Sequence, residues 1–339
     1  MKPILQFIVA ALVVVTSNLH AVEPEKPSKT SILVLAARAV GAHDPDPTVR
    51  NPDWLAERLL GPDERGQIPD YAVLALEQDY RAAMKHPIMS HLVRSMTVRT
   101  RFMDDHLLGA VAGGAVQIVN LGAGFDSRAW RFRSELRNTR IFEVDYGPTQ
   151  EYKRRRVAAV IGPAPQNLVY VPIDFTREKL ADVLRRAGYR RDRKTFFIWE
   201  GVTMYIPNEA VLDTLRFIAG NAAPGSGVVF DYYPMSRLTA LPKVSEAERV
   251  TQAMFKEWGE PWIFGIPDGT TRAYVAGAGL TLVEEIAATG PEAFRRYLTR
   301  KDGTLAGDLL SPPAPLLGPD RYVHYYALAT VPNPETRSR

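Results

Sequence analysis

The feature that most constrains the fold is an apolar run that ends abruptly in two glycines. Residues 117–121 read Gln-Ile-Val-Asn-Leu, and Gly122 and Gly124 follow directly. Such a run is typical of a buried parallel strand, and glycine lets the backbone turn sharply and approach a ligand closely. A second apolar run, 140–145, ends in Asp145. A carboxylate at this place can bind both hydroxyls of a ribose, so the two runs predict a nucleoside-binding α/β domain.

Two further apolar runs end in acidic residues. Residues 168–173 stop at Asp174, and residues 195–199 stop at Glu200. The carboxyl ends of the strands form the ligand crevice of an open α/β sheet, so we expect these acids to gather there with Asp145. A row of acids suits ribose hydroxyls, an exocyclic amine and a positive centre, but it repels a pyrophosphate. The pattern therefore favours S-adenosylmethionine over NAD.

Three segments of the chain resemble one protein family. They read Leu-Gly-Ala-Gly-Phe-Asp-Ser-Arg-Ala-Trp at 121–130, Phe-Glu-Val-Asp at 142–145 and Trp-Glu-Gly-Val-Thr-Met-Tyr at 199–205. The family is that of the leucine carboxyl methyltransferases, in particular its bacterial S-adenosylmethionine-dependent branch, and the likeness runs from about residue 30 to residue 329. The resemblance implies the class I methyltransferase fold, a Rossmann-like α/β sheet of about seven strands with helices on both faces and an antiparallel last strand.

The resemblance also implies a set of cofactor-binding residues. The set is Arg101, Gly122, Gly124, Asp145, Asp174, Phe175 and Glu200. The glycines would line the methionine part of S-adenosylmethionine, and the acid that ends the second strand would bind its ribose. Asp174 and Phe175 would hold the adenine, Glu200 would lie near the reactive end, and Arg101 would pair with the methionine carboxylate. The residues alone leave Arg101 equally open to pairing with a neighbouring aspartate on the surface.

The element pattern and the resemblance predict a single domain over 30–339, after a signal-like segment and linker at 1–29. Its parts are a helical layer at 30–111, a cofactor-binding core at 116–232, an insert at 234–275 and the final strands at 280–330. Thr30 and Asn51 are expected as helix N-caps in the helical layer. One long amphipathic helix is predicted over 88–111, from the spacing of Leu92, Met96, Met103 and Leu107.

The insert at 234–275 is rich in methionine and aromatic residues. They include Met235, Met254, Phe255, Trp258, Trp262 and Phe264. Side chains of this kind beside a crevice exclude water and shape specificity, which predicts a lid or a wall of the acceptor pocket. A small satellite core under a long loop explains the same composition almost as well.

The expected reaction is methyl transfer to an oxygen of a small molecule or peptide. The sulfonium of S-adenosylmethionine is already a strong electrophile, so orientation of the acceptor is the main requirement. A carboxylate acceptor is ionised at neutral pH, whereas a hydroxyl acceptor needs a general base. Tyr205, Asp231 and Tyr232 are the candidates near the strand ends, but a structural role explains each of them better. The catalytic residue is therefore left unassigned, and a carboxylate acceptor is weakly favoured.

Composition excludes several classes of site. The chain has no cysteine, and its six histidines are scattered, so no metal site is expected. Forty-two basic residues stand against 38 acidic ones. The basic clusters at 153–156, 185–186 and 190–194 lack interleaved aromatic residues. We interpret them as solvated surface and expect no nucleic-acid partner.

The N-terminus resembles a secretory signal peptide. Lys2 precedes an apolar stretch at 4–15, and Leu19-His-Ala21 offers a cleavage site. S-adenosylmethionine is kept inside cells, which favours the cytoplasmic side. Export, a membrane tether through this segment alone, and a spurious upstream start all stay open.

Two other functions compete with methyl transfer. One is an NAD(P)-dependent oxidoreductase, which is disfavoured because Ser127 stands where the dinucleotide fingerprint has its third glycine. The other is an exported, non-catalytic binding protein on the same fold. The sequence leaves the acceptor and the oligomeric state open.

Overall fold

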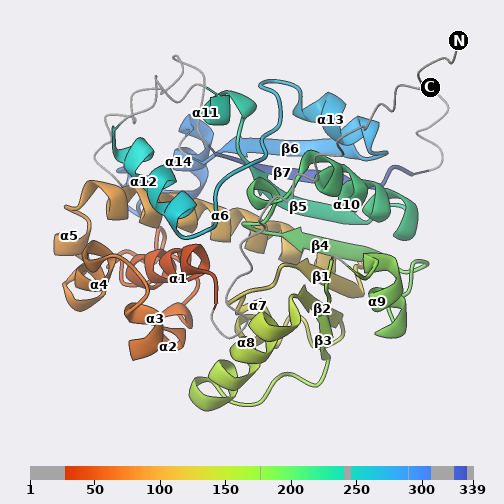
Figure 1. Ribbon diagram of the computed structural model, residues 1–339, viewed down its shortest axis with the longest axis horizontal. Helices are drawn as coiled ribbons and strands as arrows, with labels where there is room; N and C mark the ends of the chain where they lie inside the picture. Colours follow the sequence, from red (N-terminus) through yellow and green to blue (C-terminus); the bar gives the residue numbers. More distant parts are fainter. Residues whose placement is uncertain (1–26, 176, 240–245, 289, 307–323, 334–339) are drawn as a thin grey trace, which may run out of the picture.

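A mixed sheet of seven strands forms the centre of the protein (Figure 1). The computed structural model describes residues 27–175, 177–239, 246–288, 290–306 and 324–333. The strands are β1 (Gln117–Leu121), β2 (Arg140–Asp145), β3 (Leu168–Pro172), β4 (Thr195–Trp199), β5 (Gly227–Tyr232), β6 (Thr281–Ala287) and β7 (Tyr325–Thr330). Each run that the sequence predicts as a strand forms one of them.

The order of the strands is β3-β2-β1-β4-β5-β7-β6. Strands β1 to β5 pair in parallel, whereas β7 runs antiparallel to both of its neighbours, β5 and β6. This topology confirms the class I methyltransferase fold, including the antiparallel last strand. Because the strand order reverses between β1 and β4, the ligand crevice of such a sheet lies outside the carboxyl ends of these strands.

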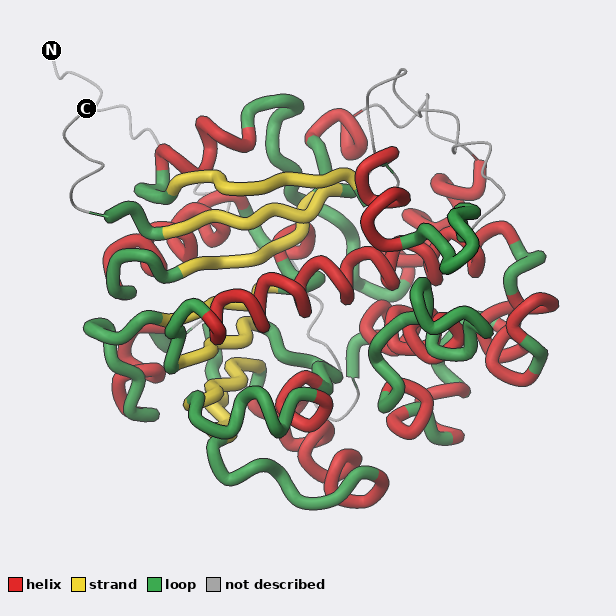
Figure 2. Tube along the Cα trace, turned by 180° about the vertical axis from the view of Figure 1, so that it is seen from behind, coloured by secondary structure: helices red, strands yellow, loops and turns green. Residues whose placement is uncertain are grey.

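Helices cover both faces of the sheet (Figures 1 and 2). They are α1 (Lys29–Gly41), α2 (Ala56–Leu59), α3 (Pro62–Arg65), α4 (Asp70–Glu77), α5 (Tyr80–Ala83), α6 (Pro87–Ala112), α7 (Arg128–Arg131), α8 (Gly147–Val160), α9 (Leu180–Arg186), the 3₁₀ helix η1 (Thr203–Tyr205), α10 (Asn208–Asn221), α11 (Met235–Thr239), α12 (Glu246–Glu257), α13 (Thr271–Gly277) and α14 (Pro291–Tyr297). Helix α6 crosses one face and contacts β4, β5 and β7 (Figure 2).

Successive side chains of the central strands pack alternately into two hydrophobic cores, one on each face of the sheet. Ile118 and Phe196 belong to the core shared with α1, α6 and α14. Their neighbours Val119 and Phe197 belong to the core shared with α9, α10 and α13. This alternation follows from the two-residue period of a strand, and burial on both faces explains why the runs are continuously apolar.

The helical layer differs from the sequence prediction at its helix starts. Helix α1 begins at Lys29, and the hydroxyl of Ser28, not Thr30, accepts the N–H of Ser31 as the cap. Asn51 does not cap a helix. Its side chain accepts the N–H of Asp53 in a local turn, and the next helix, α2, starts only at Ala56. A side chain that can cap a helix can also close a turn, and sequence does not separate the two outcomes.

Several predicted features lie outside the described residues. They are the signal-like stretch at 1–21, the insert residues 240–245 and residues 307–323 of the part predicted to hold the final strands. Within the described ranges, the structure contains no helix with the length and apolar character that a membrane crossing requires.

The turn that follows β1 can be tested by substituting Gly122. Its φ is +68°, and an added Cβ would lie 2.5 Å from Cγ2 of Val202. We expect Gly122→Ala to lower the free energy of unfolding by about 1–3 kcal/mol in a urea titration. Gly109→Ala in α6 is the matched control, since a Cβ there meets nothing within 4 Å. The control should be neutral or stabilising by about 0.5–1 kcal/mol, and equal effects of the two substitutions would contradict this account of the turn.

Candidate functional site

The glycine turn after β1 is tied to the acid at the end of β2. The N–H of Gly124 donates to Oδ2 of Asp145 at 2.6 Å, and the N–H of Tyr146 donates to Oδ1 at 2.7 Å. Burial raises the pKa of Asp145, while these two N–H groups act in the opposite direction. Each carboxylate oxygen has a second lone pair for a further donor. The structure thus brings together Gly124 and Asp145, two residues of the predicted set.

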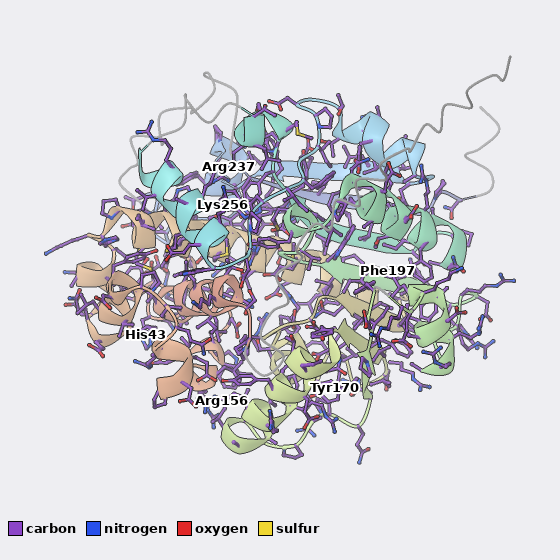
Figure 3. The ribbon with its side chains drawn as sticks, in the orientation of Figure 1. His43, Arg156, Tyr170, Phe197, Arg237 and Lys256 are labelled. Atoms are coloured by element: carbon purple, nitrogen blue, oxygen red, sulfur yellow. The ribbon has the colours of Figure 1, made fainter. Side chains whose placement is uncertain are left out.

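A cavity of about 510 Å³ opens beside Asp145, at the carboxyl ends of β2 and β3. It is lined by Tyr146, Gly147, Pro148, Tyr170, Val171, Pro172, Ile173, Asp174, Glu178, Val183, Arg186 and Ala187. Figure 3 labels Tyr170, one of the residues that line this cavity. The ring of Phe175 follows Asp174 and is 63% exposed. The arrangement offers apolar walls and two carboxylates, those of Asp174 and Glu178, to a flat ligand, and Glu178 is paired with Arg186.

Glu200 belongs to a buried network of ion pairs, which we call the charge cluster. Its members are Arg38, Arg99, Arg128, Arg131, Asp53, Asp104, Asp126, Glu200 and Asp231. Glu200 lies between two arginines, with Oε1 2.9 Å from Nε of Arg99 and Oε2 2.8 Å from Nη1 of Arg128. Four arginines and five carboxylates leave the cluster with one excess negative charge. Burial alone would raise the pKa of Glu200, but Arg128 and Arg99 hold it well below its usual range.

Some polar atoms of the charge cluster lack hydrogen bonds. Among the described residues of the cluster, four atoms are buried without a hydrogen-bond partner: Oε1 of Glu200, Nε of Arg99, Nη2 of Arg128 and Nε of Arg38. Glu200 and Arg99 therefore form an ion pair without hydrogen-bond geometry. Buried polar atoms in native proteins are nearly always hydrogen-bonded, so the atoms on Glu200 and its two arginines, Arg99 and Arg128, are expected to meet a polar ligand.

Arg101 lies elsewhere. Its guanidinium donates to the backbone carbonyls of Pro47 and Arg50, with N–O distances between 2.6 and 3.2 Å. Residues two apart on an α-helix point about 200° apart, so Arg101 faces away from the sheet when Arg99 faces Glu200. The structure thus does not bring Arg101 to the other predicted site residues.

Arg99, which contacts Glu200, is a residue of the candidate site that the sequence interpretation missed. A signal for it was present, because Arg99 falls on the apolar face of the predicted helix, between Met96 and Met103. The side chain is 4% exposed and also pairs with Asp231. A charged residue within an apolar stripe indicates a buried ion pair or a ligand contact.

The three residues considered as a general base, Tyr205, Asp231 and Tyr232, each contact another side chain. The hydroxyl of Tyr232 donates to Glu285, and the hydroxyl of Tyr205 lies 3.4 Å from Nε1 of Trp262. Asp231 accepts from Nε2 of His324 at 2.9 Å in addition to its pair with Arg99. His324 is a second residue that the sequence interpretation did not single out.

One basic cluster is only partly solvated. Lys153 is buried, and its ammonium group lies 2.7 Å from Glu143, also buried, although Arg154 beside it is exposed. This part of the surface interpretation is therefore wrong, because helix α8 turns Lys153 toward the sheet. Within the described ranges, no group of three or more histidine or acidic side chains could hold a metal ion.

Comparisons with known proteins agree with this geometry. A sequence model of the leucine carboxyl methyltransferase family matches residues 31–219, more than half of the chain. A Mycolicibacterium smegmatis protein named as an S-adenosyl-L-methionine-dependent methyltransferase is 30% identical over 291 residues, covering 82% of this chain and 89% of that protein. A similarly named protein from Mycolicibacterium vanbaalenii is 31% identical over 205 residues, which cover 60% of this chain and 66% of that protein.

A solved structure shares the fold. It is a Thermobifida fusca protein described as a methyltransferase, with a TM-score of 0.51 and 18% identity. The match covers 87% of this chain and 98% of that chain. At this identity the likeness shows the fold alone.

The charge cluster can be tested through stability. Glu200→Gln leaves Arg99 and Arg128 short of one carboxylate, so it should lower the free energy of unfolding by on the order of 3 kcal/mol at pH 7. The control is Asp213→Asn, which removes an exposed pair with Arg216 and should change stability by less than about 1 kcal/mol.

The effect of Glu200→Gln should also depend on pH. Because the folded state lowers the pKa of Glu200, its contribution is present above the unfolded value of about 4 and is lost as pH falls. The difference between wild type and variant should narrow below that pH in thermal unfolding. A difference that stays constant with pH would contradict the role given to the Glu200 charge.

Proposed function

The chain belongs to the leucine carboxyl methyltransferase family, and we propose that it transfers the methyl group of S-adenosyl-L-methionine to an oxygen atom of a small molecule or peptide. The observation that carries the proposal is the single excess negative charge of the buried cluster around Glu200. S-adenosylmethionine carries a sulfonium, an ammonium and a carboxylate, so its net charge is opposite to that of the cluster. A pyrophosphate would bring two more negative charges to the same place, which argues against NAD(P).

The candidate site offers a contact to the ribose, the adenine and the amino acid part of S-adenosylmethionine. Asp145 has a lone pair on each oxygen for the ribose hydroxyls. The cavity between Tyr146 and Asp174 has apolar walls and a carboxylate for the adenine and its amine, and Phe175 is available to cover it. Oε1 of Glu200 is buried without a hydrogen bond and would accept one from the amino acid part.

Arg99 is the arginine that we assign to the methionine carboxylate. It already lies beside Glu200, and one of its nitrogens lacks a hydrogen bond. Arg101 is bonded to carbonyls of the loop before α2. A guanidinium can bind a carboxylate with two parallel hydrogen bonds, and Arg99 lies where that bond would also neutralise the ligand's only negative group.

The protein's contribution to the reaction is orientation. Bound S-adenosylmethionine supplies an electrophilic methyl group on a positive sulfur. Holding an acceptor oxygen in line with it can lower the barrier by ~7–11 kcal/mol. Burial raises the pKa of Tyr205 and of Tyr232, and the surrounding charges and hydrogen bonds lower that of Asp231 despite its burial. All three are poor bases at neutral pH, which favours a carboxylate acceptor because it needs no base.

A hydroxyl acceptor is the second candidate, and one observation favours it. His324 is buried against Asp231, and burial lowers its pKa, so its imidazole is neutral at pH 7 and able to take a proton. Substitution of His324 distinguishes the carboxylate acceptor from the hydroxyl acceptor. His324→Gln should leave kcat nearly unchanged with a carboxylate acceptor, whereas a hydroxyl acceptor would lose about 10²–10⁴-fold.

The ribose assignment predicts the effect of Asp145→Ala. Loss of a charged, two-pronged contact should weaken S-adenosylmethionine binding by about 1.5–3 kcal/mol, or roughly ten- to a hundredfold, in isothermal titration calorimetry. Asp192→Ala is the matched control, since Asp192 is an exposed acid on a loop before β4. Unchanged affinity in Asp145→Ala would show that this carboxylate does not hold the ribose.

The two arginines of α6 can be separated with a decarboxylated analogue. Arg99→Lys should weaken the intact cofactor by more than about tenfold relative to the analogue, because the fork geometry is lost. Arg101→Lys should weaken both ligands equally or not at all. The reverse pattern would assign the carboxylate to Arg101.

A further inference from the structure

Two neighbouring loops at the amino ends of the strands carry a concentrated positive charge. One is residues 132–140, which end with the first residue of β2, and the other is residues 187–194, which lead into β4. Val116 lies between them, because its N–H donates to the carbonyl of Lys194 and its carbonyl accepts the N–H of Arg140. The two loops therefore form one surface, which we call the basic face.

Few acids offset the charge of the basic face. It holds seven basic residues, six of them arginines, and two acids, Glu135 and Asp192. The loops that lead into β1, β3 and β5 at the same end of the sheet, 113–116, 161–167 and 222–226, contain no charged residue. The basic face thus has an excess of five positive charges. Since the net charge of the whole chain is +4, this one surface accounts for the positive net charge of the protein.

The arginines of the basic face reach solvent. Arg133, Arg137, Arg191 and Arg193 are exposed, and the side chain of Arg190 is 59% exposed although it pairs with an aspartate. Basic residues in the last turn of a helix are favoured by the helix dipole. These five arginines lie in loops beyond the helix ends, so the dipole does not account for them.

The basic face lies at the opposite end of the sheet from the crevice. Its loops enter the amino ends of β2 and β4, whereas Asp145 ends β2 and Glu200 follows β4. In Figure 1, the helical layer of α1 to α5 lies on the left, and α9, which precedes the second loop of the basic face, lies on the right. A partner on the basic face would therefore leave the candidate site uncovered.

An anionic lipid surface fits the basic face better than a nucleic acid does. Single-stranded nucleic acids are usually bound by exposed aromatic rings that stack on the bases. The aromatic residues of these loops have other contacts: the Phe132 ring lies 4.7 Å from the guanidinium carbon of Arg131, and the Tyr189 hydroxyl donates to the carbonyl of Asn221. A lipid surface needs no such ring, because anionic headgroups attract each basic residue near them by a similar amount.

We propose that the basic face binds the anionic surface of a lipid bilayer and leaves the crevice turned away from it. The contact is peripheral, made by exposed arginines and not by a segment that enters the bilayer. It is independent of the proposed methyl transfer, because none of the residues involved belongs to the candidate site. The alternative is the solvated surface that the sequence predicts, which would show no preference for anionic lipid.

The test measures co-sedimentation of the full-length protein with lipid vesicles. Vesicles of phosphatidylcholine and phosphatidylglycerol in equal parts are the probe. Vesicles of pure phosphatidylcholine are the neutral reference, which also reports any binding through the apolar stretch at 4–15. The wild type should bind the anionic vesicles more tightly than the neutral ones. High salt should abolish this difference, because it screens exposed charges.

Substitution of two loop arginines should weaken the contact. The double variant Arg191→Gln, Arg193→Gln should bind anionic vesicles roughly thirtyfold more weakly, since each basic residue contributes a factor of about five. The matched control is Arg81→Gln, Arg249→Gln, which removes the same charge from exposed arginines of α5 and α12. The control should bind as the wild type does.

Three results would overturn the inference. The first is equal binding of the wild type to anionic and neutral vesicles, and the second is equal binding of the double variant and its control to anionic vesicles. The third is a short DNA duplex that binds more tightly than anionic vesicles at the same phosphate concentration, which would assign the basic face to nucleic acid. If the double variant does not fold, Arg133→Gln decides, because a loss of about fivefold is expected and unchanged affinity would contradict the inference.

Discussion

The position of Glu200 between Arg99 and Arg128 is the constraint on which the rest of the site depends. Three charged groups in the interior are tolerated only when each has its partners, because an uncompensated buried charge destabilises a protein by several kcal/mol. The pairs join β4 to α6 and α7 and continue through Asp231 into β5. These ion pairs hold the helical layer (residues 30–111) against the carboxyl ends of the central strands, where the crevice of this fold lies.

The crevice has two sides of different chemistry. The side at β2 and β3 has a cavity with apolar walls and partly exposed polar groups, and it suits a nucleoside that enters and leaves. The side at β5 holds a contact between Asp231, His324 and Arg99. Tyr205, Asp231 and Tyr232 are poor bases at neutral pH, which is consistent with a reaction in which both reactants arrive already activated.

The sequence predicts the strands well, because a strand that is buried on both faces must be continuously apolar and must end where polar groups begin. Asp145 could be placed for that reason, and its contact with Gly124 follows from the adjacent strand ends. Arg99 and Arg101 could not be told apart by resemblance, although the phase of the helix separates them. The partners of Arg99 come from β4 and β5, more than a hundred residues away, and such pairings become visible only when the topology is known.

The most direct test of the central claim is calorimetric titration of the full-length protein with S-adenosylmethionine, S-adenosylhomocysteine and NAD under the same conditions. A crevice with one excess negative charge should bind S-adenosylmethionine, bind S-adenosylhomocysteine through the ribose, adenine and amino acid contacts that the two ligands share, and leave the pyrophosphate ligand unbound. Binding of NAD, or failure to bind any of the three, would contradict the account of the charge cluster as a site for S-adenosylmethionine.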